Sequence, residues 1–171
     1  MASPVKARWW TEGRRFRSLV SAWVPCGPEE CFDYVSDFSR HSEWTTGEVR
    51  IQPVEPGPVA LGKRYNAVGV QRGKEWPAVL VVTAYERPSV FEFTATGGPI
   101  PVPDDDPHRH RFKFTPENGG TRIDQERWDP FAPSWRSWYR YWLVPIVALV
   151  AMPIRKKTVA NLARRLEQLA A

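Results

Sequence analysis

Two histidines, a glutamine and an arginine are the side chains of this sequence whose spacing best suits chemistry. His108 and His110 stand two residues apart in PHRHRFKF, and Gln125 and Arg127 stand two apart in RIDQERW. Side chains two apart on a strand point to the same face, so the four groups meet if these segments pair. A histidine beside a guanidinium can polarise a carbonyl and move a proton. The same groups can instead simply hold the polar end of a bound molecule.

A metal site is the other chemistry that this region could support. The stretch DDDPHRH brings Asp104, Asp105 and Asp106 close to the two histidines in sequence. Two histidines on one face still lack the third protein ligand that a zinc site needs. We therefore predict a solvated acidic loop leading into a strand, with no metal and no cofactor. His41, in another part of the chain, is expected to be a surface or capping residue.

The strands that must position these groups lie between residues 48 and 129. Runs of Val, Ile, Tyr, Phe and Thr are separated there by PGP, RG, RP, GGP and ENGG, which are turn signals. The connections are too short for crossover helices, so the pattern predicts an antiparallel meander. The predicted strands are 48–54, 64–71, 75–86, 89–96, 108–114 and 121–129.

The turn TPENGG predicts the register of the last hairpin, with Phe114 opposite Thr121. This register pairs opposite charges across the strands, Arg111 with Asp124 and Arg109 with Glu126. Such pairs are favourable by a few tenths of a kcal/mol each and assign this face to solvent.

The opposite face of that hairpin has an unusual composition. Phe112, Phe114 and Ile123 lie near the turn, whereas the four polar groups named above lie toward the other end. A solid core would leave those donors and acceptors unpaired, at about 1 to 3 kcal/mol each. We therefore expect this face to border a wet or ligand-filled space.

A second hairpin supplies an apolar wall for that space. A two-residue turn at Arg87 and Pro88 aligns three residues of one strand with three of the next: Leu80, Val82 and Ala84 with Phe91, Phe93 and Ala95. The large rings are candidates for lining the space, although each would equally suit a filled core: Trp76, Phe91, Phe93, Trp138 and Trp142. Tryptophan has a polar atom that favours a cavity wall over a dry core.

The two ends of the chain complete the expected architecture. A strand is predicted from Phe16 to Val24, followed by two short helices, the first beginning at Pro28. A long C-terminal helix is predicted from APSWRSWYRYW onward, with a kink or interruption at Pro145 and Pro153.

The apolar run from Trp142 to Ile154 in that helix needs a separate explanation. Its thirteen residues are too few for a transmembrane helix, which needs about 20. We expect a curved sheet to cover almost every side of it. Peripheral membrane contact is the alternative, because aromatic residues and Arg155, Lys156 and Lys157 flank the run.

The composition indicates one globular domain. The chain has 171 residues, of which 42% are hydrophobic and 13% aromatic. We expect residues 1–13 to be an N-terminal extension and 14–171 to form one domain. The net charge of +5 is dispersed, which argues against a nucleic-acid partner. No stretch resembles a signal peptide, so we expect a cytoplasmic protein. The oligomeric state stays open.

Three segments resemble the SRPBCC superfamily, which includes START lipid-transfer domains, birch-pollen-allergen-like proteins and polyketide cyclase/dehydrase-like proteins. The segments are VPCGPEECFDYVSDFSRHSEW, PGPVALGKRY and VANLARRLEQLA. The resemblance covers residues 14 to 170 and implies an α+β helix-grip fold. In that fold a curved antiparallel sheet of about seven strands, two short helices and a long C-terminal helix enclose a cavity. The family's catalytic residues differ among its branches, and none transfers to a position in this sequence.

These observations support three hypotheses. The first is a protein that binds a hydrophobic, lipid- or polyketide-like small molecule, with His108, His110, Gln125 and Arg127 holding its polar part. The second is a polyketide cyclase or dehydratase-like enzyme in which His108 or His110 is the general acid or base. The third is a lipid-handling protein that is peripheral to the membrane.

Overall fold

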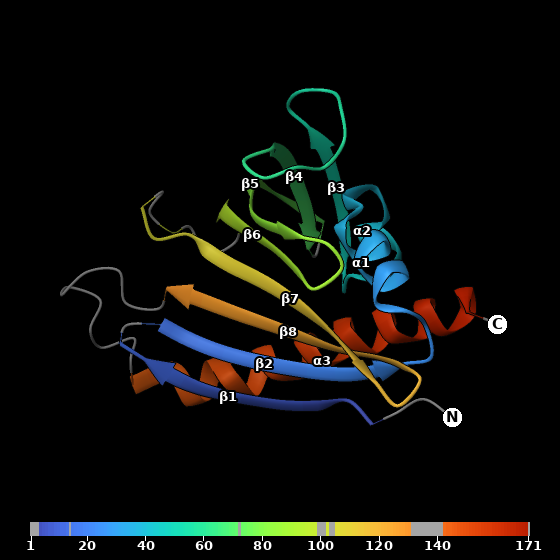
Figure 1. Cartoon of the computed structure of the whole chain (residues 1–171). Coiled ribbons are helices and arrows are strands. Elements are labelled where there is room, and N and C mark those ends of the chain that lie inside the picture. The colour runs from blue at the N-terminus through green and yellow to red at the C-terminus, as the bar shows by residue number, and fades with distance from the viewer. Residues whose placement is uncertain are drawn as a thin grey trace.

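The chain forms a single antiparallel sheet that curves around one side of a long helix (Figure 1). The computed structural model describes residues 4–13, 15–71, 73–98, 102, 105–130 and 142–170. The eight strands are β1 Lys6–Glu12, β2 Arg15–Val24, β3 Glu48–Pro53, β4 Arg64–Gln71, β5 Lys74–Glu86, β6 Val90–Gly97, β7 His108–Glu117 and β8 Gly120–Pro130. The helices are α1 Pro28–Ser36, the 3-10 helix η1 Phe38–Arg40, α2 His41–Trp44 and α3 Val144–Leu169.

The predicted α+β helix-grip architecture is confirmed, with one strand more than expected. The strand order is β1-β2-β8-β7-β6-β5-β4-β3. The additional strand, β1, pairs antiparallel with β2 through a tight turn at Gly13, whose φ is +57°. Most of the side chains of β1 are exposed, so its sequence lacks the alternation that marks a half-buried strand. The boundary between an extension and a domain at residue 13 stays a prediction.

The β7–β8 hairpin has the predicted faces but a different register. The turn consists of Asn118 and Gly119, whose φ values are 51° and 76°. Phe114 therefore faces Ile123, and the predicted pairing with Thr121 is wrong. The charge pairs that lie directly opposite are Arg111 with Glu126 and Lys113 with Asp124, in place of Arg111 with Asp124 and Arg109 with Glu126. A slip of two residues keeps every side chain on its face, so the inner face was assigned correctly.

The observed pairing of β5 with β6 differs from the predicted pairing because of a bulge. Leu80 faces Ala95 and Val82 faces Phe93, as expected. The register then shifts between Val82 and Ala84, so that Ala84 faces Glu92 and Tyr85 faces Phe91. The extra residue brings the Tyr85 ring to the core side, which the alternating pattern had assigned to Ala84.

One end of the concave face is filled by α1. Pro28 occupies the first turn of this helix, and Phe32 and Val35 are fully buried. The Phe32 ring meets the rings of Tyr85 and Phe114 edge-on, with centroid distances of 5.0 and 5.7 Å. This end of the sheet is a solid aromatic core.

Helix α3 is only half covered by the sheet, which contradicts the expectation for its apolar run. It packs on β2, β1 and α2. Val144, Ala148 and Met152 are buried, but the opposite side of the same turns is exposed, including Leu149 at 77% and Val150 at 64%. Figure 1 shows α3 lying along β1 and β2, so among the described residues only one face of this run packs on the sheet.

The prolines do not interrupt α3 within the described residues. Pro145 lies in the first turn, where no intrahelical donor is lost, and the helix continues through Pro153. The predicted start of the helix before residue 142 falls outside the described residues. None of the helices that the structure describes is long and apolar enough to cross a membrane.

Candidate functional site: a pocket between the sheet and the last helix

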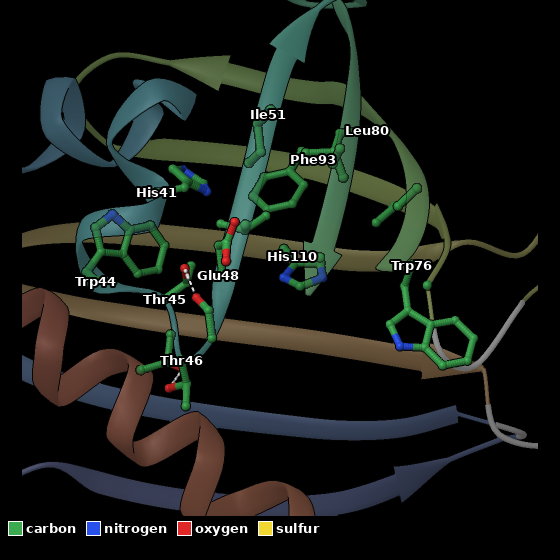
Figure 2. A pocket seen from close by; sticks show the side chains of 18 of the residues that line it. His41, Trp44, Thr45, Thr46, Glu48, Ile51, Trp76, Leu80, Phe93 and His110 are labelled. Atoms are coloured by element: carbon green, nitrogen blue, oxygen red, sulfur yellow. Dashed lines mark hydrogen bonds between the residues drawn. The ribbon is translucent and has the colours of Figure 1, made fainter. Parts of the chain in front are cut away.

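A cavity of about 400 Å³ lies between the inner face of the sheet, α2 and α3. Strands β3 to β8 all contribute to it, and Figure 2 shows residues of its wall. The larger apolar residues of the lining are Trp44, Val49, Ile51, Val70, Trp76, Leu80, Phe93, Phe112 and Ile154. The polar and charged residues are His41, Thr45, Thr46, Glu48, His110, Gln125, Arg127 and Thr158.

The structure brings together most of the predicted lining residues. Those that line the cavity are Trp76, Phe93, His110, Gln125 and Arg127. Phe91 instead belongs to the solid core, with none of its side chain exposed. His108 lies beside Asp129, and Trp142 is 76% exposed on α3. Trp138 lies outside the described residues, as does Asp104 of the acidic loop.

His41 is a buried wall residue, so its assignment to the surface was wrong. Its Nε2 donates to the Val35 carbonyl at 2.8 Å, and its ring lies between those of Phe38 and Trp44. Burial lowers the pKa of His41 to about 4, so the imidazole is neutral near pH 7. No periodic pattern marks this position, because α2 is a single helical turn.

His110 presents a neutral imidazole to the pocket. Figure 2 shows its ring next to that of Phe93, and the two stack with centroids 4.7 Å apart and planes at 11°. On the other side His110 pairs in register with Arg127 of β8. Burial, and then the positive charge of Arg127, hold the pKa of His110 well below its usual value.

A buried carboxylate organises the charged groups beside the pocket. Asp129 Oδ1 accepts hydrogen bonds from His108 Nδ1 at 2.7 Å and from Arg127 Nη2 at 2.8 Å, and Oδ2 accepts one from Arg155 of α3. Arg155 also donates to Ser18 of β2. Burial alone would raise the pKa of Asp129, but Arg127, the His108 hydrogen bond and Arg155 outweigh it and hold the pKa well below its usual range.

The sequence analysis missed this network, although part of it was accessible. Asp129 continues the period-two series of Gln125 and Arg127, so strand parity places it on the inner face. No local pattern could indicate that Arg155, 26 residues further along the chain, would return to it.

The arrangement suits binding of a molecule that is mostly apolar. Rings and aliphatic side chains form most of the wall, and a few polar groups interrupt it, among them His110, Gln125 and Arg127. Asp129 orients His108, and His108 does not line the cavity. It does not orient His110, which is the histidine that lines the pocket. Within the described ranges no three His, Cys, Asp or Glu side chains converge as a metal site would require.

Comparison with known proteins decides the family. The sequence profile described as polyketide cyclase/dehydrase and lipid transport matches residues 16–171. The chain belongs to this family. No curated protein matches it. The residues that match this profile include the whole lining of the pocket and every strand except β1.

Solved structures share the fold of this chain at low sequence identity. SA2116 from Staphylococcus aureus, of unknown function, has a TM-score of 0.71 at 14% identity, covering 93% of this chain and 98% of its own. Ms6760 from Mycobacterium smegmatis has a TM-score of 0.64 at 14% identity, covering 98% of both chains. Ara h 8.0201 has a TM-score of 0.60 at 15% identity, covering 86% and 97%.

Stability should fall as the pH drops from about 6.5 toward 4, because His41 is buried in its neutral form. The folded pKa of about 4 lies below the ordinary value of 6.5, so the unfolded state takes up the proton first. Full stability is present above pH 6.5, and about 3 kcal/mol is lost toward pH 4. His110 acts in the same direction. Urea unfolding followed by tryptophan fluorescence at several pH values measures this loss.

The variant His41→Gln should reduce that pH dependence, because its amide nitrogen can take the position of Nε2 and retain a donor for the Val35 carbonyl. Above about pH 5 the carboxylates whose pKa is lowered, Asp33 and Asp129, are ionised in both states and add no slope, and below it they add the same slope to the variant and the wild type. An identical fall in stability for the variant and the wild type would contradict the assignment of the slope to His41.

Proposed function

We propose that this protein binds a hydrophobic small molecule in the pocket between the sheet and α3. The observation that carries the proposal is the cavity of about 400 Å³, whose wall is largely apolar and includes a few polar groups. Small-molecule sites typically enclose about 300 to 1,000 Å³ with this distribution of side chains. The family description, which combines polyketide chemistry with lipid transport, supports a lipid- or polyketide-like ligand.

The same pocket allows an enzymatic variant of this function, in which His110 is the acid or base. A neutral imidazole both donates and accepts, so His110 can exchange a proton with a substrate near Arg127. His108 is less suited, because its Nδ1 is bound to Asp129 and it does not line the cavity. Binding needs only the cavity and is therefore the function that the geometry supports best.

Filling the pocket should abolish binding without unfolding the protein. Ala95 lines the cavity on β6, so Ala95→Phe places a ring in the space that a ligand would occupy. Ala7→Phe adds the same ring on the exposed face of β1 and is the matched control. Native mass spectrometry with a panel of lipids and aromatic polyketides should show complexes for the wild type and Ala7→Phe, and their loss for Ala95→Phe. Failure of the wild type to take up any of the panel would contradict the proposal.

The exposed stripe of α3 favours a second function, attachment to anionic membranes. The stripe consists of residues at helical spacing that the sheet leaves uncovered: Trp142, Ile146, Leu149, Val150 and Ile154. The next turn on this side carries the exposed Lys156 and Lys157. Aromatic and aliphatic side chains followed by cations are the composition that binds at lipid headgroups. Ile154 also lines the pocket, so the stripe reaches the cavity wall.

A charge placed in the stripe should prevent vesicle binding. Leu149 is 77% exposed, so Leu149→Glu should leave the fold intact while a carboxylate opposes insertion. Gln168→Glu makes the same change in net charge at an exposed position near the end of α3. Sedimentation with phosphatidylserine-containing vesicles measures the binding. The wild type and Gln168→Glu should bind the vesicles at low salt, and their binding should weaken at high salt. Leu149→Glu should stay in the supernatant. Absence of wild-type binding to these vesicles would refute the second function.

A further inference from the structure

We infer that the ligand of this pocket carries an anionic oxygen group, a carboxylate, and that Arg127 binds it. This inference rests on the proposed function and narrows it to amphipathic acids. It follows from the charge balance beside the pocket, from the hydrogen-bond donors of Arg127 that the protein does not use, and from the loss of water around Arg127 when a ligand enters the cavity.

The charges beside the pocket do not balance. Arg127 and Arg155 are two guanidinium groups that share the single carboxylate of Asp129. Arginine stays protonated in proteins, and even the lowered pKa of Arg155, caused mainly by burial, is about 10. His108 adds no negative charge, and His110 is neutral. Among the residues that the structure describes, one positive charge therefore remains uncompensated where Arg127 meets the cavity.

Other charges near the cavity do not remove this excess. Among the described residues, the charged members of the lining are Arg127 and Glu48. Glu48 lies on β3 with 64% of its side chain exposed, so water screens it. Glu92 is buried but bonds Arg111 and Thr83. The positive charge of Arg127 also contributes to the lowered pKa of His110, which shows that its field reaches the pocket wall.

Arg127 has donors that the protein does not use. Its Nη2 binds Asp129, and its Nε has no hydrogen-bond partner among the described residues but is fully buried, so the donors left for a ligand are those of the Nη atoms on this 27% exposed side chain. A guanidinium offers five donors in a planar fork that matches the two oxygens of a carboxylate. Gln125 is 6% exposed, lines the cavity two residues earlier on the same face and can add an amide donor.

Expulsion of water by a ligand is what selects the anion. The Arg127 side chain is 27% exposed, so water can solvate it in an unfilled pocket. A neutral apolar ligand would displace that water and leave a charged donor unpaired, which is unfavourable. A carboxylate both replaces the water and neutralises the excess charge. The apolar body of the acid would then contact Trp76, Leu80 and Phe93.

Matched acids and alcohols test the inference. The probes are decanoate with decan-1-ol, and 2-naphthoate with 2-naphthylmethanol, which separate fatty from aromatic acids while each pair keeps its apolar body. Isothermal titration calorimetry at pH 7.5 should give at least one acid an affinity about tenfold or more above that of its alcohol. A purely apolar pocket would prefer the alcohol, because a buried unpaired carboxylate is costly.

Arg127→Gln should abolish the preference for the acid. The Asp129 carboxylate keeps Arg155 and His108 in this variant, and thermal unfolding checks that the fold survives. Arg109→Gln is the matched control, since Arg109 lies on the same hairpin with 48% of its side chain exposed and interacts with Glu92 on the opposite face. Its acid-to-alcohol ratio should equal that of the wild type.

The outcomes separate this inference from the proposed function. Binding of an alcohol as tightly as its acid, for both pairs, would overturn the inference and leave hydrophobic binding standing. Retention of the acid preference in folded Arg127→Gln would overturn it as well. If neither acids nor alcohols bind the wild type, the proposed function itself fails. The wild-type comparison decides the matter even if Arg127→Gln does not fold.

Discussion

The Asp129 carboxylate is the contact on which the geometry of the pocket depends. It joins three elements: β8, which carries it, β7 through His108, and α3 through Arg155, which also reaches Ser18 of β2. A charge buried in this way must be paired, because an unpaired one costs several kcal/mol. The pairing fixes where α3 crosses the sheet. The space between the sheet and α3 beyond this crossing is then left to the cavity, with Arg127 between the carboxylate and the lumen.

The concave face of the sheet is divided between a solid end and a hollow end. At the solid end α1 inserts Phe32 against Tyr85, Phe91 and Phe114, so that ring meets ring at close-packed distances. At the hollow end a single turn of helix, α2, supplies His41 and Trp44 as a wall of the cavity. Polar groups gather at the hollow end because they can be satisfied there by water or by a ligand, whereas the solid end would leave them unpaired.

Strand parity explains why much of the site could be predicted from the sequence. The faces of β7 and β8 depend only on a period of two, so His110, Gln125 and Arg127 were placed together even though the register was two residues out. The misses arose where nonlocal packing or special backbone geometry decides. The Asn118–Gly119 turn, the bulge before Ala84 and the exposed edge strand β1 belong to this class. Contact between Arg155 and Asp129, and the exposure of Leu149, depend on where the helix meets the curved sheet, which no local pattern encodes.

A double-mutant cycle on Asp129 and Arg155 tests the central claim most directly. The free energies of unfolding of Asp129→Asn, Arg155→Met and the double variant would be measured by urea denaturation at pH 7. Asp129→Asn leaves the buried Arg155 guanidinium without its carboxylate and should cost about 3 kcal/mol or more, whereas Arg155→Met leaves Asp129 bound to Arg127 and His108 and should cost less. The double variant should then cost less than the sum by at least about 1.5 kcal/mol, the coupling expected of a direct buried pair. Additive effects of the two substitutions would show that this contact does not hold α3 over the pocket.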